Sequence, residues 1–460
     1  MKILFSAKTW FFLCALFIFY ATTIPWDIAH APTLEGISWI PGWDAKRDRI
    51  WSIPDMVQNV VLFGPFGFFG FVGLGFIRRR GAIVGALAMG FLGLALSLSV
   101  EALQTMSATR SPSTTDLLTN FLGALGGGIA AAIYVVHLEA RLVRALRETA
   151  RERPGLLILL AYFAAITLGS LAPFIPTLDL STVWENVKAF RADPWGAKPF
   201  GALITDGLLF GALAYLTAKE LPPYLSSKRW MFKTQPIAPA SAAIFAFVLV
   251  STLALALEAA QMIIIGHSPG LQDAVVGMLL AGVGAGLAAG LPGGIRPATE
   301  LGELTRRTPW LVLAFAILAP TTRAMSPFIF QTVGQGLEEI TVWQWVPFWA
   351  LFQNINVSTF RNVFEAAAFY LPLGYAVHAL GRRPRVGFVV CLVLGETLEL
   401  LQIPVVGRVF DITEGLYAGL MGLVGAWILT SLSTPDAPTR PAMNIDDAKT
   451  IPLQAPPIAR

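Results

Sequence analysis

Apolar stretches of membrane-spanning length follow one another along almost the whole chain, with short polar connections between them. A helix needs about 20 predominantly apolar residues to cross the hydrocarbon core of a bilayer, and many windows of the chain reach that length. The pattern predicts an all-α, polytopic membrane protein with about 12 transmembrane helices. The expected helices cover residues 10–24, 55–77, 81–104, 114–137, 154–173, 200–217, 239–264, 271–291, 308–324, 362–380, 385–403 and 412–432.

Polar residues at the ends of these stretches repeat with one spacing three times. Glu101 is followed by Gln104, Arg110 and Asp116, at offsets of three, six and six residues. The same offsets relate Glu258, Gln261, His267 and Asp273, and again Glu399, Gln402, Arg408 and Glu414. The repeat predicts three four-helix units at 1–150, 151–300 and 301–432, the second of them degenerate. Because each unit has an even number of helices, the three are expected to be parallel.

The two ends of the chain differ in composition from the repeated units. The first apolar stretch follows two lysines and precedes an Ala-His-Ala sequence, a combination also found in signal peptides. We favour a retained helix, because the later units begin with an equivalent one. Residues 433–460 are rich in proline and have no apolar periodicity, so this tail is predicted to be disordered and cytoplasmic.

Lysine and arginine are distributed unevenly between the two alternating sets of connections. The set that includes both ends of the chain carries 23 of these residues, and the other set carries 10. Positively charged residues are concentrated on the cytoplasmic side of membrane proteins. Both termini are therefore predicted to be cytoplasmic, and the three polar clusters are predicted to lie on the outer side of the cell membrane.

Composition narrows the class of protein further. With 55% hydrophobic and 13% charged residues, the chain lies outside the range of soluble domains. Cys14 and Cys391 lie in apolar stretches, which argues against a disulfide framework and a zinc site. We expect no cofactor and no metal, and the lack of a long basic block argues against nucleic acid. The expected partner is the lipid bilayer, while the oligomeric state stays open.

The predicted outer ends of the helices bring together carboxylates, carboxamides and cations. Ionisable groups at membrane depth are costly unless they pair or take part in function, so these clusters are candidate sites. The second helix of a unit contributes further polar residues, and so does the fourth helix of the first unit. The candidate ligand-binding residues are Asp55, Asn59, Glu101, Gln104, Arg110, Asp116 and Asn120 in the first unit, Asp206, Glu258, Gln261, His267 and Asp273 in the second, and Asn362, Glu399, Gln402, Arg408 and Glu414 in the third.

Each candidate also has a purely structural interpretation. Arg110 either pairs with Glu101 or Asp116 and holds the connection between two helices, or it contacts a ligand, and we weigh the two equally. For Glu101 and Gln104, a buried carboxylate beside an amide favours binding of a proton, a cation or a polar head group. Small residues such as Gly123 are expected to pack helices closely. The first unit has the fullest polar set and is the expected functional one.

The motif residues of the first unit, taken in sequence order, resemble the pattern of the VanZ-like membrane protein family. The family pattern is D…N…P-x-G, then E-x-x-Q, then R…D…N-x-x-G. In this chain it falls on Asp55, Asn59, Pro65, Gly67, Glu101, Gln104, Arg110, Asp116, Asn120 and Gly123. The third unit departs from it at Glu414 and Ala418, and the second departs most, with His267 and Gly277. The resemblance implies four-helix units and an envelope-related role, since the namesake is associated with teicoplanin resistance, but it implies no reaction.

Three classes of function stay open on the sequence. The favoured one is binding of an envelope lipid, a lipid-linked glycan or a glycopeptide, with an effect on envelope or antibiotic tolerance. The second is a membrane-embedded enzyme with Glu101 or Asp116 as general base and Arg110 stabilising an anion. The chain lacks a recognisable nucleophile, metal-ligand or phosphate-loop motif, so no catalytic residue is assigned and enzymatic activity is left undecided. The third is a transporter that uses the outer carboxylates.

Overall fold

The computed structural model describes thirteen segments, which are residues 6–23, 31–32, 37–44, 49–50, 53–76, 81–107, 112–171, 180–196, 198–227, 238–264, 270–291, 310–349 and 357–433. Over these segments the protein is helical, apart from two paired two-residue strands, β1 (Trp43–Asp44) and β2 (Arg49–Ile50). The predicted all-α class is therefore confirmed. The tail predicted to be disordered, residues 433–460, lies outside the described residues except for Ser433.

Each predicted apolar stretch is helical in the structure. The first four helices are α1 (Ala7–Thr23), α2 (Ile53–Leu74), α4 (Ala82–Gln104) and α5 (Thr114–Ile133). They are followed by α7 (Pro154–Leu171), α8 (Leu180–Ala192), α9 (Phe200–Ser227), α10 (Pro239–Gln261) and α11 (Leu271–Gly290). The remainder are α13 (Trp310–Met325), α14 (Val333–Glu338), the 3₁₀ turn η2 (Val342–Trp345), α16 (Val357–Ala379), α17 (Pro384–Leu401) and α18 (Ile412–Ser433). The hydropathy pattern did not predict the less apolar α8 and α14.

Six of the described helices are long and apolar enough to cross a bilayer. They are Met56–Leu74, Ala82–Gln104, Thr114–Thr149, Phe200–Pro222, Pro239–Gln261 and Leu271–Gly290. Four further apolar helices are shorter, at Ala7–Thr23, Gly155–Leu171, Val312–Met325 and Ile412–Ile428. Helices of this length and composition indicate a membrane protein.

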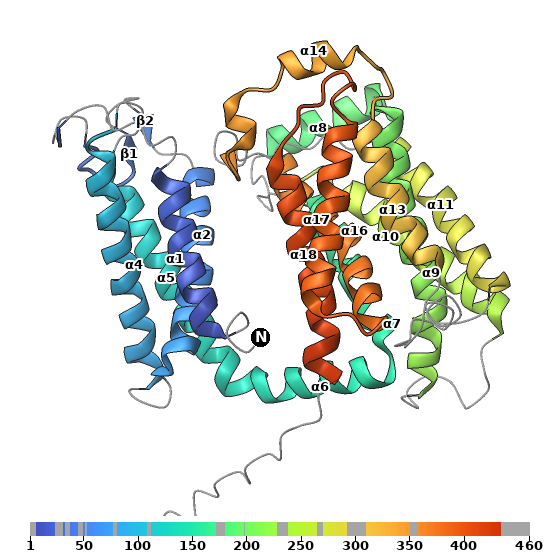
Figure 1. Cartoon of the computed structure of the whole chain (residues 1–460), viewed down its shortest axis with the longest axis horizontal. Helices are drawn as coiled ribbons and strands as arrows, with labels where there is room; N and C mark the ends of the chain where they lie inside the picture. The colour runs from blue at the N-terminus through green and yellow to red at the C-terminus, as the bar shows by residue number, and fades with distance from the viewer. Residues whose placement is uncertain are drawn as a thin grey trace, which may run out of the picture.

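Two helical bundles make up the described part of the chain (Figure 1). In the first bundle α2 and α4 both pack along α5, and α1 packs against α2. Its core contains Phe63, Phe66 and Ala124 in one layer and Phe71 and Met89 in another, all almost completely buried. The second bundle contains α7 to α18 and has one continuous core.

Helices from two parts of the sequence interlock in the second bundle. The helices α9, α10 and α11 are arranged like α2, α4 and α5, and so are α16, α17 and α18. We call each of these three groups a set, and its members are the second, third and fourth helices of a predicted unit. The helices α7 and α13, which open the two predicted units, each pack against both sets, because both of them contact α9 and α16. The buried side chains of Tyr162, Leu213 and Phe369 belong to the shared core. Because the sets share this core, we expect them to fold together.

A helix of different direction joins the two bundles. α5 continues through a π-helical turn, Tyr134–Leu138, into α6 (Glu139–Glu152), which lies across the ends of the other helices (Figure 1). A π-helical turn is a recognised cause of a helix kink. The exposed Leu138, Leu142 and Leu146 form an apolar row along this segment. The sequence predicted this basic stretch as a connection, so its helical structure is a correction.

Backbone contacts bring the second and fourth helices of each set unusually close. A Cβ atom added at Gly127 would lie 2.0 Å from the carbonyl oxygen of Gly64, so α5 touches α2 through its backbone. Cβ atoms at Gly284 and Gly425 would lie 2.0 and 2.1 Å from carbonyl oxygens of α9 and α16. Small residues permit this approach between helices in lipid. The crossings fix the ends of the helices, where the polar clusters lie.

Candidate functional site

A buried glutamate holds the connection between the third and fourth helix of every set. In each case Oε2 of the glutamate accepts a hydrogen bond from a backbone N–H twelve residues later, directly before the fourth helix. The pairs are Ser113 N to Glu101 Oε2 at 2.8 Å, Gly270 N to Glu258 Oε2 at 2.9 Å, and Asp411 N to Glu399 Oε2 at 2.9 Å. The three glutamates are 8%, 9% and 3% exposed. A carboxylate at a helix start satisfies a free N–H group and suits the helix dipole.

Two of the predicted glutamines tie the third helix to the helix that opens its unit. Gln104 Nε2 donates a hydrogen bond to Thr22 O near the end of α1, at 2.9 Å. Gln261 Nε2 donates in the same way to Ser170 O near the end of α7, at 3.0 Å. These amides satisfy carbonyl groups that lack a partner at the end of a helix.

The third set makes this connection with an arginine. Arg408 Nε donates to Ser326 O at 2.9 Å, and its Nη2 donates to Arg323 O at 2.6 Å, both at the end of α13. The amide of Gln402 instead donates to Oε2 of Glu399. A cation at a helix C-terminus interacts favourably with the helix dipole. Arg408 therefore has the role of a helix staple that the sequence allowed for arginine.

The acidic residue at the start of each fourth helix has a different partner in each set. The contacts are Asn59 Nδ2 to Asp116 Oδ1 at 2.7 Å, Lys198 to Asp273, and Asn362 Nδ2 to Glu414 Oε1 at 3.3 Å. Further down α5, Asn120 Nδ2 donates to Ser97 Oγ at 2.8 Å. The structure thus brings together the predicted residues of one set and keeps the three clusters separate.

Three of the predicted residues cannot be placed in this network. Arg110 and His267 lie outside the described residues, and of Asp55 only the position in α2 is described. Asp206 lies on α9 as a half-buried residue. The two interpretations of Arg110 therefore remain predictions.

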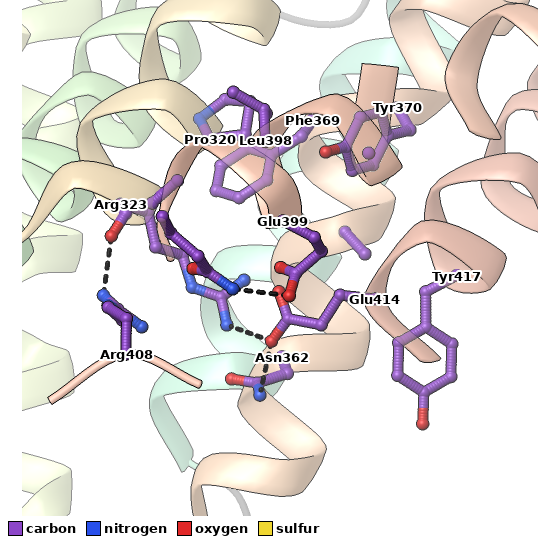
Figure 2. A pocket seen from close by; sticks show the side chains of 14 residues that line it. Pro320, Arg323, Asn362, Phe369, Tyr370, Leu398, Glu399, Arg408, Glu414 and Tyr417 are labelled. Carbon is purple, nitrogen blue, oxygen red and sulfur yellow. Dashed lines mark hydrogen bonds and ion pairs between the residues drawn. The ribbon is translucent and has the colours of Figure 1, made fainter. Parts of the chain in front are cut away.

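A cavity opens beside the polar cluster of the third set (Figure 2). It lies between α13, α16, α17 and α18, and its volume is about 30 Å³. This space admits a water-sized polar group such as one end of a head group, and the remainder of a larger molecule has to lie outside it. The lining residues with polar or aromatic side chains are Arg323, Asn362, Phe369, Tyr370, Glu399, Gln402, Arg408, Glu414 and Tyr417.

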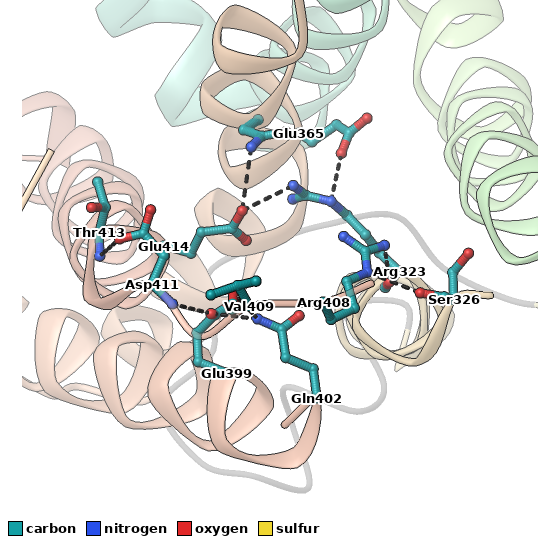
Figure 3. Close-up of polar contacts among 11 residues, drawn as sticks. Arg323, Ser326, Glu365, Glu399, Gln402, Arg408, Val409, Asp411, Thr413 and Glu414 are labelled. Atoms are coloured by element: carbon teal, nitrogen blue, oxygen red, sulfur yellow. Dashed lines mark hydrogen bonds and ion pairs between the residues drawn. The ribbon is translucent and has the colours of Figure 1, made fainter. Parts of the chain in front are cut away.

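Arg323 bridges two carboxylates at this cavity (Figure 3). Its Nε lies 3.2 Å from Glu365 Oε2, and its Nη2 lies 3.1 Å from Glu414 Oε1. The side chains of Arg323 and Glu365 are 17% and 8% exposed, and that of Glu414 is 32% exposed. Carboxylates from α16 and α18 therefore meet at one guanidinium from α13, which links three helices at the cavity wall.

The sequence did not single out several residues of these networks. Arg323 and Lys198 lie outside the repeated spacing, because one ends the helix that opens the third unit and the other precedes α9. Asp411 was also missed, although it directly precedes α18. Arg323 is a cation at the end of an otherwise apolar helix. This position was the sequence feature that could have identified it as a partner of the acidic residues.

The environment of the connection between α17 and α18 changes the acid–base properties of two groups. Burial raises the pKa of the Asp411 carboxyl, while hydrogen bonds from Thr413 act in the opposite direction. Burial, with Arg323 nearby, lowers the pKa of the Arg408 guanidinium.

Removing the glutamate staple of the first bundle is expected to destabilise it. In Glu101→Ala the buried N–H of Ser113 loses its acceptor, so the free energy of unfolding should fall by about 1–3 kcal/mol. Glu101→Gln keeps an acceptor and should lose less. Thermal unfolding of the purified variants in detergent measures both. If the alanine variant unfolds like the wild type, Glu101 does not hold the connection.

The first bundle is similar to a known protein family. Residues 9–136 match the VanZ/LLP1 family model. The match covers α1, α2, α4 and α5, including the glutamate and glutamine described above, and supports a VanZ-like unit there. This similarity and the apolar helices together indicate a membrane protein with a VanZ-like first bundle. No curated protein and no solved structure matches the chain.

Proposed function

We propose that this protein binds the polar head group of a cell-envelope lipid, lipid-linked glycan or glycopeptide in the cavity of the third set. The observation that carries the proposal is the convergence of two arginines, two glutamates and an amide on one cavity. Binding sites of this kind combine apolar walls with a few convergent polar groups. An effect on envelope or antibiotic tolerance would follow from capture of such a molecule.

In this proposal the chain contains three parallel VanZ-like units and spans the cell membrane with about 12 helices. Support comes from two contacts that recur in all three sets, the glutamate staple and the backbone contact of the second and fourth helices. Support for orientation comes from the excess of lysine and arginine on the side that includes α6 and both chain ends. The polar clusters then face outward and both termini are cytoplasmic.

We place the ligand in the third unit rather than in the first. In the first two units, the candidate side chains with described contacts mostly connect helices to one another. The third unit uses the same staple and adds the cavity. The lining residues of this cavity include no serine, cysteine or histidine. A covalent mechanism through one of these nucleophiles therefore has no residue in the lining, while an enzyme with a glutamate as general base stays the alternative together with a transporter.

Filling the cavity is the direct test of this function. Ala366 lines the cavity, and Ala366→Met should exclude a ligand without touching a charged group. Native mass spectrometry of protein released from its own membrane is expected to show a bound envelope molecule in the wild type and not in this variant. Ala161→Met is the matched control, because it fills an apolar cavity of about 30 Å³ beside α7. Equal adducts in all three proteins, or none in the wild type, would contradict the proposal.

A further inference from the structure

The polar wall of the cavity carries a surplus of acidic groups. Glu399 and Glu414 line it, and Glu365 and Asp411 lie in direct contact with lining residues. The lining contains two basic side chains, Arg323 and Arg408, compared with these four carboxyl groups. A site at membrane depth with more acidic than basic groups attracts a positively charged ligand.

The donors of the two arginines are largely engaged with the protein. Arg323 spans Glu365 and Glu414, and Arg408 donates to two carbonyl groups at the end of α13. A ligand anion would have to compete with these contacts. The arginines are therefore better suited to shape the cavity than to bind the ligand.

Glu399 presents an oxygen atom to the cavity. It is 3% exposed, and both of its hydrogen bonds, from Asp411 N and Gln402 Nε2, fall on Oε2 (Figure 3). Among the described residues no donor reaches Oε1. This oxygen is therefore available to accept a hydrogen bond from a donor that enters the cavity.

Aromatic side chains also line the cavity. Phe369, Tyr370 and Tyr417 line the same cavity as Glu399 and Glu414. Aromatic faces attract ammonium groups through their quadrupole, most strongly where water is excluded. Carboxylates together with aromatic rings form a wall that recognises an organic cation rather than a phosphate.

We propose that the cavity binds the primary ammonium group of an aminated head group, of the kind carried by an ethanolamine phospholipid, with Glu399 and Glu414 as its acceptors. This inference rests on the proposed binding function and specifies the ligand class. The ammonium group donates to Oε1 of Glu399 and packs against Tyr417 and Tyr370. The remainder of the head group lies toward the mouth of the cavity.

The test compares lipids that differ at the amine. Native mass spectrometry of the purified full-length protein measures binding of phosphatidylethanolamine, its N-acetylated form and phosphatidylglycerol, and soluble phosphoethanolamine distinguishes a free amine from a lipid. Binding of phosphatidylethanolamine is expected to be at least about tenfold tighter than binding of the acetylated lipid or of phosphatidylglycerol. Glu399→Gln should remove this preference. Glu101→Gln, which alters the equivalent staple in the first bundle, should keep it.

Other results of these experiments would contradict one or both proposals. Equal, cavity-dependent binding of all three lipids would overturn the ammonium assignment and leave head-group binding in place. If the wild type carries no adduct that Ala366→Met removes, both proposals are overturned. Should Glu399→Gln fail to fold, Tyr417→Leu removes an aromatic wall without changing a charge and must weaken the preference for the amine. An unchanged preference in Tyr417→Leu would contradict the proposed site.

Discussion

Gly127→Val is expected to prevent the first bundle from folding. The new Cβ would lie 2.0 Å from the carbonyl oxygen of Gly64 and 2.9 Å from a backbone nitrogen of the same helix, so α2 and α5 would have to separate. Overpacking typically costs about 1–3 kcal/mol, and a clash with backbone cannot be relieved by a side-chain rotation, so we expect the upper end or more. The measurement is the yield of monodisperse protein in detergent and its unfolding temperature.

The same helix supplies the control for this substitution. A Cβ atom at Gly126 meets nothing within 4 Å, so Gly126→Val introduces the same side chain without the clash. Its yield and unfolding temperature should stay close to those of the wild type. If both variants behave alike, the close crossing of α2 and α5 is not what limits folding.

Arg323→Gln is expected to have the second large effect. The substitution leaves the carboxylates of Glu365 and Glu414 without the cation that they share. Breaking a buried ion pair costs about 3–5 kcal/mol, and because Glu414 is about one-third exposed we expect about 3 kcal/mol. Chemical or thermal unfolding in detergent measures the loss.

Two comparisons separate this electrostatic effect from a packing effect. Arg323→Lys keeps the charge without the planar fork and should lose less stability than Arg323→Gln. The deficit of Arg323→Gln should also shrink as the pH is lowered, because protonation removes the unpaired negative charges. A deficit that is the same at every pH would indicate that the side chain contributes through packing.

The sequence was informative about helices and about contacts within one set. Apolar length located the helices, and the repeated spacing placed Glu101, Glu258 and Glu399 at equivalent positions, because the staple spans twelve residues of local sequence. The sequence did not predict which helices of different units pack against each other. The contacts of α7 with α16 and of α13 with α9 join segments that are far apart in the sequence, and the spacing carries no signal for them.

The residue types of the candidate site were predictable, whereas the expectation that the first unit is the functional one stays a prediction. The first unit has the fullest polar set, yet the cavity described above lies in the third unit, where Arg323 enters from α13. No spacing rule connects Arg323 to Glu414, which is 91 residues away. The direction of α6 was also unpredictable, since a basic connection and a helix across the bundle ends have the same composition.

An experimental density map of the full-length protein in nanodiscs formed from its native membrane lipids would test ligand binding in the third unit most directly. We expect non-protein density between Glu399, Glu414 and Tyr417, with Arg323 still joining Glu365 and Glu414. The side chains around Glu101 in the first unit should then connect helices without an added group between them. A map in which the cavity of the third unit is closed, or in which Arg323 turns to pair with Glu399, would contradict the proposed site.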